Sequence, residues 1–434
     1  MARHTKNSRG TSGITTHHAT SPKTVIPRSE HGISRTNISE NALKVLYQLK
    51  RAGFDGYLVG GGVRDLLLDR RPKDFDIVTN ARPEQVRQLF RKGCILIGRR
   101  FRLAHVRFGR EVIEVATFRA PQDDTDTGDR VTVNGRIVRD NIYGSSIAGD
   151  VWRRDFSVNA LYYNIRDFSI IDFTGGMADL QARTLRLIGN PETRYREDAV
   201  RVLRAARFAA KLGFRIHPDT EAPIRELGNL LGEMPPARLF DEALKLFHGG
   251  YALSSFRLLR RHDLFRQLFP ATNAILARNK SGFTHRLLER TLTNTDARIA
   301  EGKPVTPSFL FAAFLWEPMG QMAKHNRERG MKTAPAFEAA KREIIAQQIK
   351  RVMLPRRHVV MIKDIWTFQQ RLIRQKNPKQ LIAHPRFRAA YDFLVLRAEA
   401  GDEQVREIAQ WWTDFQSGKT TRKKNQDRTH LRKP

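Results

Sequence analysis

The segment from Tyr57 to Asn80 constrains the fold most, because it joins a short run of β-forming residues to a glycine turn and then to a pair of aspartates. Residues 57–59 are apolar and predict a strand, and residues 63–68 predict a short helix. The glycines at 60–62 lie between them. Glycines at such a junction allow a sharp turn and let phosphate oxygens approach main-chain N–H groups near a helix N-terminus. The segment therefore predicts either a phosphate site or a simple turn.

The two aspartates that follow favour the phosphate site. Asp74 and Asp76 flank the start of a second β-forming stretch, residues 75–79. Side chains two apart on a strand leave the same face, so we expect both carboxylates on one side of a sheet. Paired carboxylates can hold Mg²⁺, which stabilises the attacking and leaving oxygens of a phosphoryl displacement. The alternative is a solvated strand end, but together with the glycine turn the pair indicates phosphoryl-transfer chemistry.

The charge of the chain predicts an anionic partner. The 434 residues carry a net charge of +32. Residues 1–37 contribute +5 and residues 417–434 contribute +6, so residues 38–416 still carry +21. Nucleic acid is the first expectation and an anionic membrane surface the second.

Cysteine content and hydropathy bear on the compartment. Cys94 is the single cysteine, which excludes an intramolecular disulfide and favours the cytoplasm. No apolar run approaches the length of a membrane span, and the N-terminus lacks the apolar core of a secretory signal. Its Ser, Thr and Arg content is also that of an organelle transit peptide, but a disordered basic arm is the simpler interpretation.

Further strands are predicted after the aspartate pair. A helix is expected over 82–91, and strands over 94–97, 103–108 and 111–117. Alternation in the last of these places Glu114 between small or apolar neighbours on one face. Glu114 is therefore either a third metal ligand or an edge-strand charge. Residues 120–150 are polar and without periodicity, which predicts a long loop, and residues 170–173 predict another short strand.

From Glu192 the pattern becomes helical. Residues 192–214 predict one helix that ends at Gly213, with a cationic face of Arg201, Arg204, Arg207 and Lys211 that lacks matching acids over most of its length. Such a face is either solvated or in contact with phosphates.

The chain thus divides into five predicted parts. They are a disordered basic arm (1–37), an α+β head with a small mixed sheet (38–190), a helical neck (191–250), a helical body (251–416) and a disordered basic tail (417–434).

Several motifs resemble the tRNA nucleotidyltransferase/poly(A) polymerase family. In the head these are LVGGGVRD (58–65), DFD (74–76), IEVATFR (113–119) and RRDFSVNAL (153–161), and in the neck RYREDAVRVLRAARFAAKLG (194–213). The resemblance covers residues 40–416 and implies the family's fold, a β-sheet head followed by an all-helical neck, body and tail. The segment LIGRRFRLAHVRFG (96–109) is similar to the polymerase branch rather than to the CCA-adding branch.

The resemblance also implies site residues. Asp74 and Asp76 would hold the catalytic Mg²⁺, with Asp155 or Glu114 as the third carboxylate, of which we favour Asp155. Around the triphosphate it implies Gly60, Gly61, Arg64 and Asp65. Around the sugar it implies Arg154, Asp155 and Asn159, and facing the base it implies Asp198 and Arg201.

The expected function is template-independent addition of AMP from ATP to RNA 3′ ends. RNA would be bound through the basic neck, body and tails with little sequence specificity. A CCA-adding enzyme is the nearest alternative, and a noncatalytic RNA-binding protein is the alternative from another class. The RNA targets, the oligomeric state and protein partners do not follow from the sequence.

Overall fold

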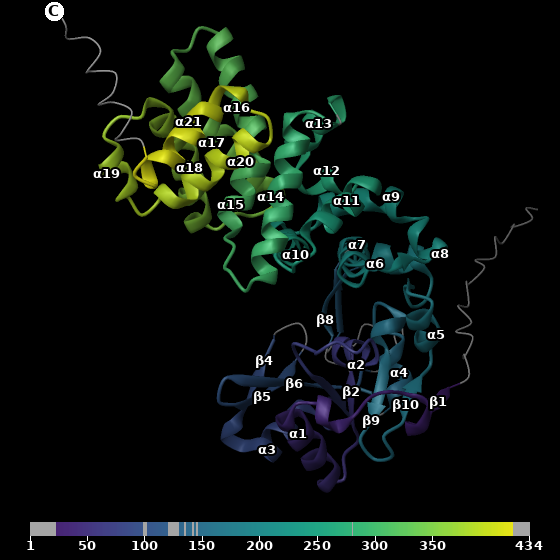
Figure 1. The fold of residues 1–434 in the computed structure, drawn as a ribbon. Coiled ribbons are helices and arrows are strands. Elements are labelled where there is room, and N and C mark those ends of the chain that lie inside the picture. The colour runs from purple at the N-terminus through teal and green to yellow at the C-terminus, as the bar shows by residue number, and fades with distance from the viewer. Residues whose placement is uncertain are drawn as a thin grey trace, which may run out of the picture. The chain divides into compact units, whose positions relative to one another are not determined.

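Figure 1 shows the fold of the chain, a computed structural model. The structure describes residues 23–98, 102–119, 130–133, 136–140, 143–144, 146–279 and 281–419. The chain forms two compact units, one of residues 1–130 and 139–178, the other of residues 131–138 and 179–434. The predicted features at 1–22, at 99–101 and at 420–434 lie outside the described residues.

An eight-stranded mixed sheet forms the centre of the first unit, in the order β1-β10-β9-β2-β3-β6-β5-β4. Only β3 and β6 run parallel to each other, and the other neighbouring pairs are antiparallel. The strands are β1 (Thr24–Ile26), β2 (Gly56–Val59), β3 (Asp76–Thr79), β4 (Cys94–Ile97), β5 (Leu103–Phe108), β6 (Glu111–Thr117), β9 (Leu161–Asn164) and β10 (Ile170–Asp172). The mixed sheet confirms the predicted α+β class.

Helices cover this sheet and supply its core. They are α1 (Glu40–Arg51), α2 (Gly61–Leu67), α3 (Pro83–Phe90), α4 (Ile147–Val151) and α5 (Gly176–Gln181), with 3-10 turns η1 (Arg28–Glu30), η2 (Arg35–Asn37), η3 (Arg91–Gly93) and η4 (Ser157–Asn159). Ser39 caps α1, and its Oγ accepts from the N–H groups of Asn41 and Ala42. The buried face of α1 includes Val45 and Leu49, which are fully enclosed.

Two sequence predictions for residues 1–150 are wrong. Residues 24–37 belong to the arm predicted as disordered, yet β1 pairs with β10 in the register Thr24 to Asp172, and η1 and η2 follow it. Residues 120–150 were predicted as one loop, yet they include the paired strands β7 (Arg130–Val133) and β8 (Arg136–Asp140) and the helix α4. The predictions relied on apolar periodicity, and strands of three to five residues are too short to show it. Such short strands are stable only when they pair with a neighbouring strand.

The second unit is almost entirely helical, as the neck and body were predicted to be. Its helices are α6 (Pro191–Glu197), α7 (Val200–Leu212), α8 (Pro218–Glu221), α9 (Ile224–Leu227), η5 (Gly228–Glu233), α10 (Pro236–Phe247), α11 (Ala252–Arg261), α12 (Phe265–Leu268), α13 (Pro270–Arg278), α14 (Phe283–Ala300), α15 (Pro307–Phe314), α16 (Trp316–Glu328), α17 (Thr333–Arg351), α18 (Arg356–Arg374), α19 (Pro378–Ile382), α20 (Phe387–Glu399) and α21 (Glu403–Gln416). A parallel pair, β11 (Thr184–Leu185) and β12 (Arg215–Ile216), lies among them. Among the described residues, none of the helices is long and apolar enough to cross a membrane.

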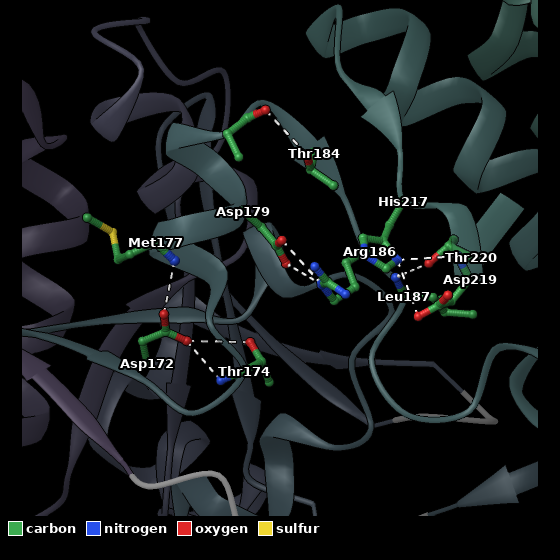
Figure 2. Close-up of polar contacts among 11 residues, drawn as sticks. Asp172, Thr174, Met177, Asp179, Thr184, Arg186, Leu187, His217, Asp219 and Thr220 are labelled. Carbon is green, nitrogen blue, oxygen red and sulfur yellow. Dashed lines mark hydrogen bonds and ion pairs between the residues drawn. The ribbon is translucent and has the colours of Figure 1, made fainter.

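Polar side chains stabilise the segment that follows β10 in the chain. Figure 2 shows Asp172, whose carboxylate accepts from the N–H groups of Thr174 and Met177 and so orders the turn after β10. Further along the chain Asp179 forms an ion pair with Arg186 at 3.0 Å. The hydroxyl of Thr220 accepts from the N–H of Leu187.

The helix predicted over 192–214 is broken. α6 ends at Glu197 and α7 begins at Val200, because Asp198 adopts extended backbone angles between them. Gly213 ends α7 in the left-handed conformation, as predicted. The break lies at Asp198, one of the two residues that the resemblance implies for base recognition.

Candidate active site

The glycine turn lies directly against the aspartate pair. Gly60 follows β2 with φ +75°, and α2 begins at Gly61. A Cβ atom on Gly60 would lie 3.5 Å from Oδ2 of Asp76, and one on Gly62 would lie 3.2 Å from the carbonyl oxygen of Asp74. The backbone angle and this close approach both favour glycine. The turn therefore brings bare main chain beside the two carboxylates.

Asp76 and Glu114 form a row of acids on one face of the sheet. Asp76 is the first residue of β3 and pairs in register with Glu114 on β6, and Glu114 pairs in turn with His105 on β5. Nε2 of His105 lies 3.3 Å from Oε1 of Glu114. Asp74 is exposed just before β3. Glu114 has buried neighbours in the chain, but its own side chain is 51% exposed.

The electrostatics of this row suit a cation. Burial raises the pKa of Asp76 to about 6, and the negative charges of Glu114 and Asp74 add to the rise, while Arg154 opposes it. A positive ion beside Asp76 would relieve this repulsion. Within the described part of the chain no three His, Cys, Asp or Glu side chains converge as a metal site. A pair of carboxylates that shares Mg²⁺ with substrate phosphates is nevertheless a common arrangement.

Arg64 is a buried link between α2 and η4. Its side chain is 1% exposed. Nη1 donates to Oδ1 of Asn159 at 2.5 Å, and Nη2 donates to Oδ1 of Asp65 at 2.6 Å. The structure therefore brings together these residues from the LVGGGVRD and RRDFSVNAL motifs. Because Arg64 is enclosed, it would act on a ligand mainly by holding Asp65 and Asn159 in place.

Arg154 is held by two groups that the sequence analysis missed. Its Nε donates to Oδ2 of Asp150 at 3.1 Å and to the hydroxyl of Tyr162 at 2.8 Å, and that hydroxyl donates to the same carboxylate oxygen. Burial disfavours the charge of Arg154, but the facing Tyr162 and Asp150 outweigh it, and its pKa is raised. Next to it, Oδ1 of Asp155 accepts from the N–H of Phe156. The position of Asp150 in a segment predicted as loop concealed it.

In the neck, each of the two implied base-reading residues has an oppositely charged partner. Oδ2 of Asp198 accepts from Nη2 of Arg238 at 2.6 Å. Nη1 of Arg201 donates to Oε2 of Glu197 and to the carbonyl oxygen of Arg194. Arg238 lies at the start of α10, 40 residues from Asp198 in the chain, and no spacing along the sequence pointed to it. The pairs fix the side chains on either side of the α6–α7 break.

Two of the four cations on the face predicted for α7 lie beside carboxylates of this chain. Arg201 is paired with Glu197 four residues earlier. Arg207 is buried, with its Nε 3.5 Å from Oε2 of Glu242 on α10. The expectation concerned acids four residues away, and Glu197 is one such acid for Arg201. The acid beside Arg207 comes from a distant helix, which spacing along the chain does not reveal.

The sequence of this chain matches three models of known protein families. The model of the poly A polymerase head domain matches residues 56–186, that of the probable RNA and SrmB-binding site of polymerase A matches 213–276, and that of the polymerase A arginine-rich C-terminus matches 329–433. Poly(A) polymerase I of Salmonella typhi is 50% identical over 402 residues, which cover 91% of this chain and 86% of that protein. The chain belongs to the tRNA nucleotidyltransferase/poly(A) polymerase family.

The CCA-adding members of the family match less of the chain. The CCA-adding enzyme of Leuconostoc citreum is 38% identical over 229 residues, which is 52% of this chain and 54% of that enzyme. Among solved structures, the Bacillus stearothermophilus CCA-adding enzyme in complex with CTP superposes with a TM-score of 0.57 at 26% identity, over 86% of this chain and 80% of that one. The family's nucleotidyltransferase fold is thereby confirmed for this chain.

Proposed function

We propose that this chain is a template-independent adenylyltransferase that adds AMP from ATP to RNA 3′ ends. The observation that carries the proposal is the extent of the similarity. Identity to proteins named Poly(A) polymerase I runs through 91% of the chain, whereas the CCA-adding relatives match about half of it. The aspartate pair beside the glycine turn supplies the chemistry that this activity requires.

The reaction joins two phosphate-bearing substrates. The RNA 3′ oxygen forms a bond to the α-phosphorus of ATP, the bond to the bridging oxygen of the β-phosphate breaks, and pyrophosphate leaves while the hydroxyl proton passes to solvent. Mg²⁺, when bound by Asp74 and Asp76, would supply charge stabilisation to the oxygens involved. Burial raises the pKa of Asp76, and repulsion from Glu114 and Asp74 adds to the rise, which favours a cation beside this carboxylate.

The protein's own part is positioning. The backbone of Gly60 and Gly61 would approach the triphosphate, with Asp65 held beside it by Arg64. Asn159, on the other side of Arg64, would lie near the sugar together with Arg154 and Asp155. We favour Asp155 over Glu114 as the third carboxylate, since Glu114 is already directed toward His105. Holding the reacting groups in line accounts for much of such a rate enhancement.

Base selection is assigned to the neck. Asp198 and Arg201 would read one edge of adenine through hydrogen bonds, as the resemblance implies. Each is held by its own counter-charge, Arg238 and Glu197. A pocket fixed in this way suits an enzyme that adds one base repeatedly. It suits less well an enzyme that must accept cytosine first and adenine last.

One assay separates the candidate functions. A generic RNA primer is incubated with Mg²⁺ and each nucleoside triphosphate in turn, and product length is measured. Long tracts made with ATP alone support the proposal. Addition of a CCA end that requires CTP and is confined to tRNA would identify a CCA-adding enzyme. RNA binding without any extension would identify a noncatalytic RNA-binding protein.

A further inference from the structure

A polar cavity of about 710 Å³ lies on the first unit, on the face of the sheet opposite to Asp76. Phe75, which lies between the two aspartates, lines it. Glu111 also lines it and lies three residues before Glu114 on β6, so the two glutamates leave opposite faces of that strand. The cavity is therefore on the other side of the sheet from Asp76 and Glu114 and is separate from the candidate metal site.

Cationic side chains of one short loop converge on this cavity. Arg70, Arg71 and Lys73 lie between α2 and β3, line the cavity and are exposed. The described residues provide none of these side chains with a hydrogen bond or an ion pair, whereas Arg64 nearby is fully engaged. Unpartnered cations in a concave polar site are available to bind an anion.

The loop is ordered without using those charges. The N–H of Arg70 donates to the carbonyl oxygen of Asp65 at 2.8 Å, which ends α2, and Asp69 takes a left-handed φ of +54°. Pro72 is buried and restricts the backbone between Arg71 and Lys73. The cationic side chains are thus presented from a fixed backbone, which lowers the entropy lost when a ligand binds.

Two acids line the cavity, Asp69 and Glu111, and Glu111 is already engaged. The carboxylate of Glu111 accepts from Oγ of Ser39 and from Nδ2 of Asn41, both at 2.5 Å. Glu111 therefore lies at the N-terminal end of α1. Because its negative charge already interacts with that helix end, the helix attracts a second anion less strongly. The exposed charged side chains that remain are one acid, Asp69, and three cations, Arg70, Arg71 and Lys73, so the open part of the lining has a net positive charge. Hydroxyl and amide groups such as those of Thr36 and Asn37 also line the cavity. That combination matches a ribonucleotide, with a phosphate for the cations and hydroxyl groups for the polar wall.

We propose that this cavity binds the backbone of the RNA a few nucleotides upstream of its 3′ end. The proposal rests on the proposed function, which brings a single-stranded polyanion to Asp74, the residue next to Lys73 in the chain. RNA that leaves the aspartate pair and passes around the start of β3 reaches the loop cations. The cavity would grip the primer while its 3′ end stays free to react.

The test compares two double variants of equal charge change. Arg70→Gln/Arg71→Gln removes cations from the cavity, and Lys50→Gln/Arg51→Gln removes exposed cations from the far end of α1 in the same unit. RNA affinity is measured against salt concentration by fluorescence anisotropy. The cavity variant should lower the log–log slope by about 1.4 for two lost single-strand phosphate contacts. The control should leave the slope near that of wild type, and Arg70→Lys/Arg71→Lys should restore it.

Primer length supplies the second measurement. KM is determined for a long primer and for one of a few nucleotides that ends before the cavity. The cavity variant should raise the ratio of the long-primer KM to the short-primer KM several-fold relative to the control. Equal slopes and equal ratios in the two variants would overturn the proposal. Absence of any extension by the wild-type chain would instead refute the proposed function, while the anisotropy measurement would still decide whether the cavity binds RNA.

Discussion

Asp76 and Glu114 are register partners on the parallel strands β3 and β6, and their carboxylates leave the same face of the sheet. This relationship explains why the pKa of Asp76 is raised to about 6, since burial and the neighbouring charge act in the same direction. It also makes Glu114 a neighbour of the candidate metal site whether or not it binds metal. Three predictions concern this row of acids.

Removing either aspartate should abolish nucleotide addition. Asp74→Ala and Asp76→Ala each leave one carboxylate to balance the metal charge, and we expect a loss of at least about a thousandfold in kcat, which corresponds to several kcal/mol. Primer extension with ATP measures the loss, and circular dichroism checks the fold. Glu84→Ala, an exposed acid paired with Arg102, is the control and should remain active. Near wild-type turnover in either aspartate variant would refute the metal site.

The third carboxylate can be identified by amide substitution. We expect Asp155→Asn to reduce kcat about as strongly as Asp76→Ala and to raise the Mg²⁺ concentration needed for half-maximal rate. Glu114→Gln should cost much less and should lower the pKa of Asp76, because the charge that raises it is gone. Mg²⁺ titrations of the extension rate measure both variants. The opposite ranking would assign the catalytic role to Glu114.

The raised pKa of Asp76 predicts a pH-dependent stability in the absence of metal. The folded-state value of about 6 lies above the ordinary 3.8, so the protonated form is favoured by folding. This contribution is fully present below pH 3.8 and is lost as pH rises through about 6. Asp76→Asn should therefore be more stable than wild type above that range, by up to about 3 kcal/mol, and no more stable at acid pH. Melting curves in EDTA across this range check it, and a constant difference between the proteins would contradict it.

A substitution in the neck should weaken base selection more than it weakens phosphate chemistry. Arg201→Ala removes a guanidinium that Glu197 holds in position, so discrimination between ATP and CTP should fall by about tenfold, roughly 1.4 kcal/mol, as for one charged hydrogen bond. Arg196→Ala, whose ion pair with Glu192 is exposed, should keep the wild-type preference. The ratio of kcat/KM for the two nucleotides is the measurement. An equal loss with both nucleotides would place Arg201 outside the base site.

Gly176 should tolerate no larger residue. A Cβ atom at this position would collide with the carbonyl oxygen of Ser157, the first residue of η4, which carries Asn159. Gly176→Ala should destabilise the protein by about 1–3 kcal/mol, as overpacking does, and should also impair ATP binding by displacing Asn159. Gly320→Ala, in α16 with open space around it, should be neutral or stabilising. Chemical denaturation of both variants makes the comparison, and equal stabilities would contradict the packing at Gly176.

Local patterns were enough to predict much of the head. Strands β4, β5 and β6 occupy the predicted residues. Burial alternates along β5 and β6, whereas β4 could be predicted only from its β-forming residues. β1 and β7–β8 were missed, since strands this short are defined by their partners. The α6–α7 break was missed because the apolar periodicity continues across Asp198, and the Arg238 that binds it lies 40 residues away.

For the candidate site too, features within one segment could be predicted, and features that join distant segments could not. The aspartate pair and the glycine turn could be predicted because they lie within one short segment. The register of Asp76 with Glu114 could not, because it joins strands separated by α3, β4 and β5. The hold of Asp150 and Tyr162 on Arg154 was equally hidden, since only the folded chain brings a buried phenol beside that guanidinium.

The pairing of β1 with β10 has a consequence for synthesis. Thr24 cannot meet Asp172 until the whole head has been made, so the ribosome must release the last strand of the sheet before the first can dock. Until then the edge of β10 is open to pairing with other chains. Shortened proteins that start after residue 26 would keep that edge exposed permanently, and we expect them to aggregate during expression even though every residue of the aspartate pair and the glycine turn is present.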